Sequence, residues 1–207
     1  MADIQPPERG ASGTSQRTLV VLHGHGGIGS AAATLAAAID PDGTAVHVTP
    51  DGPVVLRTGE HAWFDNGSAS SIRTAGAVVR GALEGVDGPG VVVVGWSQGG
   101  AAALAALALE DAEPLPGVVG LALLGSFLAD APGLHYDLSR LAGVPVLIQH
   151  GSDDDVVPAF FAADLAHALT DAGVEVDHRE VPLGHELDDA AVAEVAEWVT
   201  SRWRDVT

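Results

Sequence analysis

The most constraining stretch of the sequence is the run from Val91 to Gly100, in which four valines lead into Gly95-Trp96-Ser97-Gln98-Gly99. β-Branched residues favour strands, and the alanine- and leucine-rich segment that follows favours a helix. Ser97 is therefore predicted at a strand-to-helix turn, within a G-x-S-x-G pattern typical of a nucleophile held on a tight, strained backbone. Glycine turns also form for packing alone, so this motif indicates a catalytic serine only if a base and an acid follow.

Apolar runs alternate with helix-forming segments along the rest of the chain. This alternation predicts a single α/β domain over residues 17–207, preceded by a flexible leader over residues 1–16. The continuous apolar strands predict a mostly parallel sheet of about six to seven strands, with helices on both faces. Strands are expected at 18–22, 45–49, 91–94, 118–124, 144–149 and 174–181. Helices are expected at 31–39, 71–83, from the serine turn to about 109, at 159–172 and at 188–203.

Four chemically suggestive loops follow predicted strands. They contain His23 to Gly29, Ser97, the three aspartates 153–155, and His185. Right-handed crossovers bring the loops that follow parallel strands to one edge of the sheet, where α/β proteins bind ligands. Two further stretches, 54–69 and 125–140, show no clear period and are expected to be functional loops at this edge.

A serine nucleophile needs a neutral imidazole and a carboxylate that orients it. His185 is the candidate base, because it follows the last strand and every candidate acid. The acid is expected among Asp153, Asp154 and Asp155, and their spacing alone does not choose between them. His150 stands at a strand end and is expected to be a packed residue that orients this loop. His23 and His25 form an H-x-H pair, but no further ligand cluster accompanies them, so no metal site is expected.

The composition excludes several classes of function. The net charge of −19, with arginine as the sole basic residue type besides histidine, disfavours binding to nucleic acid or to anionic lipid. The absence of cysteine excludes disulfides and thiolate chemistry. No signal peptide and no apolar run long enough to span a membrane is recognised, so we expect a cytoplasmic protein. A homodimer is kept as a candidate assembly, and a salt-adapted source as one explanation of the acidic surface.

Together these segments resemble the α/β-hydrolase superfamily, and within it the phospholipase/carboxylesterase family that includes acyl-protein thioesterases. The segments that carry the resemblance are Leu22-His23-Gly24-His25-Gly26, Ala62-Trp63-Phe64-Asp65, Gly95-Trp96-Ser97-Gln98-Gly99-Gly100, His150-Gly151-x-x-Asp154-x-x-Val157-Pro158 and Gly184-His185-Glu186. The resemblance covers about residues 18–203 and implies an α/β-hydrolase fold without a large cap domain.

The resemblance also implies roles for individual residues. It selects Asp154 as the acid, because the family's acid lies four residues before the proline of its valine-proline pair. It implies that the backbone N–H groups of His25 and Gln98 form the oxyanion hole. Relatives usually have an apolar residue at position 25, so His25 is a departure that places a titratable side chain beside the site. No cofactor is implied.

The expected function is a serine carboxylesterase acting on small or medium-chain acyl esters through Ser97. An acyl thioesterase or lysophospholipase on the same triad is the alternative, followed by a non-catalytic binding protein, and peptidase or perhydrolase chemistry also stays open. Six residues near the predicted mouth are candidates for substrate binding, although packing of the loops would explain them equally well. They are Trp63, Phe64, Trp96, Phe127, Leu128 and Phe160.

Overall fold

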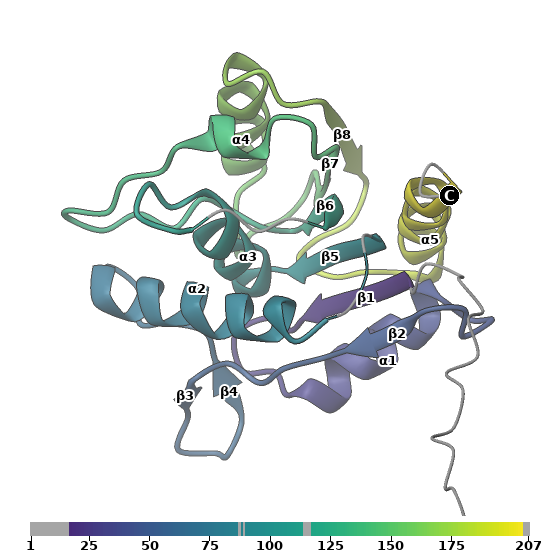
Figure 1. The fold of residues 1–207 in the computed structure, drawn as a ribbon, viewed down its shortest axis with the longest axis horizontal. Helices are drawn as coiled ribbons and strands as arrows, with labels where there is room; N and C mark the ends of the chain where they lie inside the picture. Colours follow the sequence, from purple (N-terminus) through teal and green to yellow (C-terminus); the bar gives the residue numbers. More distant parts are fainter. Residues whose placement is uncertain (1–16, 87, 89, 114–116, 205–207) are drawn as a thin grey trace, which may run out of the picture.

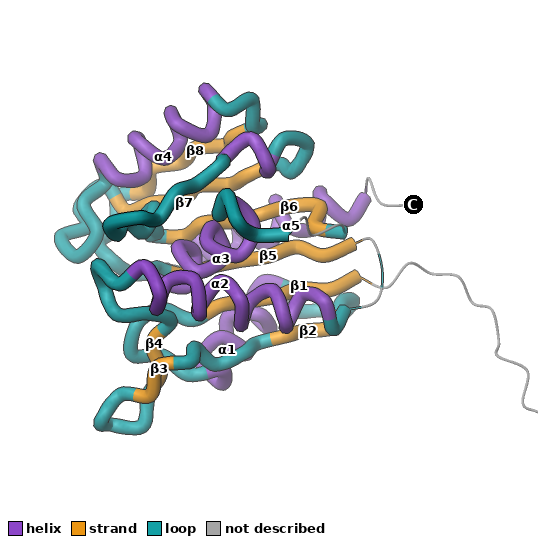
Figure 2. Tube along the Cα trace, turned by 60° about the vertical axis from the view of Figure 1, so that its left-hand side comes forward, coloured by secondary structure: helices purple, strands orange, loops and turns teal. Residues whose placement is uncertain are grey.

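A six-stranded sheet forms the centre of the fold in the computed structural model, which describes residues 17–86, 88, 90–113 and 117–204. The strand order is β2-β1-β5-β6-β7-β8, and all neighbouring strands run parallel (Figure 2). The mostly parallel sheet predicted from the sequence is therefore confirmed, whereas the proposed leader lies outside the described residues. The strands are β1 (Arg17–Leu22), β2 (Val46–Val48), β5 (Gly90–Trp96), β6 (Val118–Leu124), β7 (Val146–Gly151) and β8 (Val176–Val181).

Helices cover both faces of this sheet (Figure 1). They are α1 (Gly29–Ile39), α2 (Ala69–Glu84), α3 (Gln98–Ala108), α4 (Phe160–Asp171) and α5 (Asp189–Arg204). Successive side chains of a strand point to opposite faces. Accordingly, Val91 and Val93 join the core beneath α2, α3 and α4, and Val92 and Val94 join the core beneath α1 and α5. Within the described residues, no helix is both long and apolar enough to cross a membrane.

Helix α3 is the most deeply placed helix, since every one of its residues is buried. Its alanines and glycines allow neighbouring backbone to approach closely. A Cβ atom added to Gly76 of α2 would lie only 3.0 Å from the backbone of Ala105 in α3. The small residues that favour helix formation after Ser97 therefore also seat this helix between α2 and the sheet.

The strand order changes direction between β1 and β5. From β1 the chain passes through α1 to β2 on one side, and β5 then pairs with the other side of β1. The loops that leave β1 and β5 diverge at this point, which opens the crevice where α/β sheets bind ligands. The His23 loop and Ser97 follow these two strands.

The two stretches predicted to be irregular each contain a short piece of regular structure. Residues 54–69 include an antiparallel pair, β3 (Val54–Val55) and β4 (His61–Ala62), and residues 125–140 lead into a short 3-10 helix, η1 (Leu138–Leu141). The His61 backbone pairs with the loop after β1, because Gly26 N donates to His61 O at 2.9 Å and His61 N donates to Gly27 O at 2.8 Å. The hairpin thus braces the loop that begins at His23.

Candidate active site

Ser97 occupies the turn between β5 and α3 in a left-handed conformation, with φ 51° and ψ −119°. It is the only non-glycine residue with positive φ in the described part of the chain, and such a conformation persists only where its surroundings impose it. Its N–H donates to Leu124 O at 2.8 Å, and the Ser126 hydroxyl donates to the Ser97 carbonyl at 2.9 Å. The backbone on both sides of the serine is therefore fixed.

Gly95 and Gly99 are required by the close approach of backbone at this turn. A Cβ atom on Gly95 would overlap the backbone of Gly100, and one on Gly99 would lie 2.6 Å from His23 O. Both distances fall below what a side chain tolerates. The two glycines of the motif consequently allow α3 to start against the end of β1, which brings the His23 loop beside Ser97.

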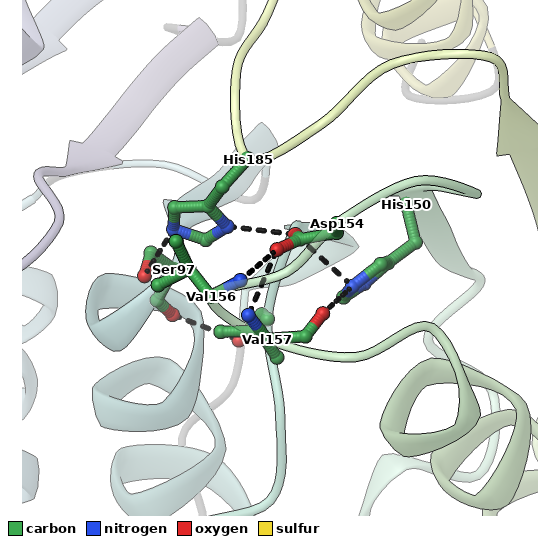
Figure 3. Close-up of polar contacts among 7 residues, drawn as sticks. Ser97, His150, Asp154, Val156, Val157 and His185 are labelled. Atoms are coloured by element: carbon green, nitrogen blue, oxygen red, sulfur yellow. Dashed lines mark hydrogen bonds and ion pairs between the residues drawn. The ribbon is translucent and has the colours of Figure 1, made fainter.

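His185 lies in the loop after β8 and bridges Ser97 and Asp154 (Figure 3). Its Nε2 is 3.0 Å from Ser97 Oγ, and its Nδ1 is 2.7 Å from Asp154 Oδ2. The Trp96 ring packs against the imidazole with ring centroids 4.7 Å apart. Because a carboxylate only accepts hydrogen bonds, Nδ1 carries the proton and Nε2 is left to accept from the serine hydroxyl. This tautomer is the one that general-base chemistry at Ser97 requires.

Asp154 lies in the loop after β7 with a fully buried side chain. Its Oδ1 accepts hydrogen bonds from Val156 N at 2.9 Å and Val157 N at 2.8 Å. Burial acts to raise the pKa of this carboxyl, but the hydrogen bonds from His185 and from both valine N–H groups outweigh it, so the pKa lies below its usual value. Asp153 and Asp155 are exposed. Of the three predicted acids, Asp154 is the one hydrogen-bonded to His185.

The loop after β1 lies against the other side of Ser97. A Cβ atom on Gly24 would lie 3.4 Å from Ser97 Cβ, which places the His25 backbone close to the serine. The next two N–H groups are already engaged, since Gly26 N donates to His61 O and Gly27 N donates to Gly24 O. Gln98 is the first residue of α3, and the first N–H groups of a helix lack partners within it. The donors predicted at His25 and Gln98 are thus near Ser97.

Buried hydrogen bonds join the loop after β1, the segment before α2 and the start of α3. Trp63 Nε1 donates to His23 O at 2.7 Å, and Trp63 N donates to Gln98 Oε1 at 2.8 Å. Gln98 Nε2 in turn donates to Phe64 O at 2.8 Å. We call His23, Trp63, Phe64 and Gln98 the oxyanion-side cluster. This use of the Gln98 side chain is not predicted from the sequence, where the only signal is a polar residue at the start of an otherwise apolar helix.

His23 holds two loops of this cluster together as a neutral imidazole. Its Nδ1 donates to Gly24 O at 2.7 Å, and its Nε2 accepts from Gly52 N at 3.1 Å. A second proton on Nε2 would abolish the bond from Gly52. Burial lowers the pKa of His23 below its usual value, which favours the neutral form. The ring therefore acts here as a fixed link between backbone groups.

A cavity of about 540 Å³ opens beside Ser97 and His185. Its apolar wall is formed by Trp96, Phe127, Val156, Val157 and Phe161, and its polar wall includes His25 and Asn66. Cavities of a few hundred cubic ångströms with mainly apolar walls and few polar groups are typical of small-molecule sites. Across the described residues, no group of three or more histidine, cysteine, aspartate or glutamate side chains is arranged to hold a metal ion.

The structure brings only part of the predicted substrate-binding set to this cavity. Trp96 and Phe127 line it. Trp63 and Phe64 are buried in the oxyanion-side cluster, and Leu128 packs against the core. Phe160 is 57% exposed and packs on Phe161, with ring centroids 4.3 Å apart, so its neighbour supplies the wall instead. A loop aromatic in the sequence does not reveal which way its ring points.

Comparison with known proteins gives one family and a consistent fold. The model of the Phospholipase/Carboxylesterase family matches residues 10–202. A carboxylesterase from Mesorhizobium loti superposes with a TM-score of 0.77 at 26% identity, covering 90% of each chain. Acyl-protein thioesterase 2 from Zea mays gives a TM-score of 0.75 at 24% identity, covering 92% of this chain and 95% of that one. A Bacillus cereus carboxylesterase gives 0.73 at 22% identity, covering 90% and 89%. The similarity to the Zea mays and Bacillus cereus proteins, at 24% and 22% identity, shows a shared fold only.

Proposed function

The chain belongs to the phospholipase/carboxylesterase family of α/β-hydrolases, and from this premise we propose that it is a serine carboxylesterase for small or medium-chain acyl esters. The observation that carries the proposal is the triad-like arrangement in which His185 Nε2 is 3.0 Å from Ser97 Oγ and His185 Nδ1 is 2.7 Å from Asp154 Oδ2. Both contacts lie within the range for general-base activation of a serine hydroxyl.

In the proposed acylation step, Ser97 Oγ attacks the ester carbonyl while His185 Nε2 takes the hydroxyl proton. Asp154 stabilises the imidazolium that forms, and its pKa below the usual value keeps it ionised for this task. The tetrahedral intermediate then collapses as His185 returns the proton to the leaving alcohol. The products of this acylation step are the free alcohol and an acyl ester on Ser97.

We place the developing oxyanion between the N–H groups of His25 and Gln98, with the N-terminus of α3 behind it. Two preorganised donors in a site shielded from water stabilise negative charge more strongly than water does, and losing one typically costs about 10²–10³ in rate. The N-terminal end of a helix adds a favourable partial positive charge. Water activated by His185 then attacks the acyl-enzyme, releases the carboxylic acid and restores Ser97.

The cavity supports the proposed substrate size. Its volume of about 540 Å³ suits a small or medium-chain ester. The apolar wall around Phe127 and Phe161 suits an acyl chain, and the polar wall at His25 and Asn66 suits a hydrogen-bonding alcohol portion. An oxygen ester and a thioester present the same carbonyl to Ser97, so acyl thioesterase or lysophospholipase activity on the same residues is the alternative.

The test is hydrolysis of p-nitrophenyl esters by the wild type and by Ser97→Ala. Wild-type turnover of the acetate or butyrate is expected, with a loss of about 10⁴–10⁶ in kcat for the variant. Wild-type turnover equal to that of the variant would disprove the esterase proposal. A panel of oxygen esters and thioesters of increasing acyl length then separates the alternatives: preference for short oxygen esters supports the proposal, and preference for thioesters or long chains favours its rivals.

A further inference from the structure

His150 is the penultimate residue of β7 and lies against the acid of the candidate triad (Figure 3). Its Nε2 is 2.7 Å from Val157 O and 3.3 Å from Asp154 Oδ2. The side chains of His150 and Asp154 are both fully buried. The carboxylate that orients His185 thus has a second imidazole beside it, on the side away from Ser97.

The partner of His150 identifies which ring nitrogen donates. A carbonyl oxygen only accepts hydrogen bonds, so Nε2 carries a proton and donates it to Val157 O. Nδ1 is buried and has no hydrogen-bond partner among the described residues. The Nε2–H group therefore lies at the Val157 carbonyl, with the Asp154 carboxylate close beside it.

The two oxygens of the Asp154 carboxylate are bound in different ways. Oδ1 is held by the N–H groups of Val156 and Val157, which belong to its own loop. Oδ2 is hydrogen-bonded to His185 at 2.7 Å, and His150 Nε2 lies 3.3 Å from it. His150 thus adds a polar N–H group beside the oxygen that orients His185. His150 also holds the carbonyl of Val157, whose N–H binds Oδ1.

We propose that His150 is a positioning residue for the hydrolytic reaction: its Nε2–H fixes the Asp154 carboxylate and the Val157 backbone, and thereby orients His185 toward Ser97. The inference rests on the proposed function, because it assigns His150 a role in that reaction. His150 touches neither Ser97 nor the substrate cavity, so it acts only through Asp154. Polar groups that orient a reacting side chain in this way commonly contribute about 10–100-fold to activity, by analogy with partners of metal ligands.

A matched pair of amide variants tests the geometry. The amide nitrogen of His150→Gln reaches the place of Nε2, whereas that of His150→Asn reaches only the place of Nδ1; His150→Phe removes both nitrogens. We expect kcat, normalised to active sites titrated with a fluorophosphonate, to stay within about threefold in His150→Gln. In the other two variants it should fall by about tenfold or more, with KM changed less than about twofold. Equal kcat in all four proteins, or equal losses in the two amide variants, would overturn the proposal.

Two further measurements keep the inference testable if a variant folds poorly. The low-field proton resonance of His185 Nδ1–H should move in the Asn and Phe variants and stay in place in the Gln variant, because it reports the hydrogen bond to Asp154 directly. In an Asp154→Asn background, His150→Asn should cost little further activity, since residues that act through one another are non-additive. A full additional loss would contradict action through Asp154.

The outcomes also separate this inference from the proposed function. If the wild type hydrolyses no ester but the His185 resonance moves as expected, the esterase proposal fails, and His150 orients His185 through Asp154 without serving ester hydrolysis. If the wild type is an active esterase and the three variants match it in kcat and in the resonance, the esterase proposal stands and the role of His150 is wrong.

Discussion

The two sides of Ser97 use buried histidines in different ways. On the acid–base side, His150 Nε2 donates to the carbonyl of Val157 and lies 3.3 Å from the Asp154 carboxylate. On the oxyanion side, the neutral ring of His23 joins two backbone groups, Gly24 O and Gly52 N. His150 thus lies beside the carboxylate that binds His185. His23 lies between two peptide groups and holds a loop in place.

On both sides of Ser97, one buried group has a pKa below its usual value. Hydrogen bonds hold the pKa of Asp154 below its usual value against the effect of burial, and burial holds the pKa of His23 below its usual value. Near neutral pH, the first shift maintains an ionised carboxylate and the second an uncharged imidazole. Both states are the ones that the respective hydrogen bonds require. The comparison therefore predicts a large kinetic effect on the acid–base side and combined stability and kinetic effects on the oxyanion side.

The largest effect is expected at the acid. Asp154→Asn should reduce kcat by about 10⁴, because an amide does not stabilise the imidazolium and favours the wrong tautomer of His185. Asp153→Asn and Asp155→Asn are matched controls on exposed neighbours, and each should change kcat by less than about twofold. Steady-state kinetics with p-nitrophenyl butyrate measures all three. If kcat fell as much in either neighbour's variant as in Asp154→Asn, the assignment of Asp154 as the acid would be wrong.

A smaller and mixed effect is expected at Gln98. Gln98→Met keeps the length of the side chain but leaves Trp63 N–H and Phe64 C=O unpaired in a buried site. Each unpaired group costs about 1–3 kcal/mol, so the melting temperature should fall by several degrees. We also expect kcat/KM to fall by about tenfold to 10², because the adjacent backbone donor loses its support.

Trp63→Phe provides the graded comparison for Gln98→Met. Of the hydrogen bonds in the cluster it removes only the one from Nε1 to His23 O, but it also leaves a cavity where the larger indole ring was buried. We therefore expect a comparable loss of melting temperature but a smaller loss of kcat/KM, because both hydrogen bonds of Gln98 remain. Calorimetry and steady-state kinetics on the same preparations measure both quantities. A stable, fully active Gln98→Met protein would show that the side-chain hydrogen bonds of Gln98 support neither the fold nor the reaction.

The smallest effect is a pH dependence at His23. Its pKa is lower in the folded protein than in the unfolded chain, so its contribution to stability is fully present above the unfolded value of about 6.5 and is lost as pH falls through the folded value. His23→Gln keeps an acceptor for Gly52 N–H without a titrating group. Urea unfolding at pH values from 8 to 5 should show a shallower decline for the variant. Parallel curves for the two proteins would show that His23 has the same pKa in the folded and unfolded states, which would contradict the effect of burial.

The sequence predicts the sheet but not the β3–β4 hairpin, because the strands of the two differ in length and burial. The four inner strands, β1, β5, β6 and β7, are buried on both faces, so they appear as continuous apolar runs such as Val91 to Val94. The hairpin has strands of two residues each, which is too short for any period to show. Its pairing with the loop after β1 depends on backbone groups of His61, and backbone hydrogen bonds leave no trace in residue type.

Side-chain direction explains the remaining differences at the site. Successive helical residues differ by about 100° in direction, so at the start of α4 Phe161 reaches the cavity and Phe160 does not. The sequence predicts Trp63 and Phe64 near the mouth of the site because their stretch shows no regular period, yet both side chains are buried. The contact between His150 and Asp154 spans four residues of non-helical chain, so no regular spacing predicts it.

The complete burial of α3 has a consequence for how the protein opens. Amide hydrogens in a helix enclosed on every side exchange with solvent only when most of the fold opens, whereas those of exposed loops exchange through local openings. Val156, in the loop after β7 at the rim of the cavity, belongs to the second class and is 65% exposed. The backbone of this part of the rim can therefore open locally, while Ser97 keeps its place at the start of a helix that opens only with most of the fold.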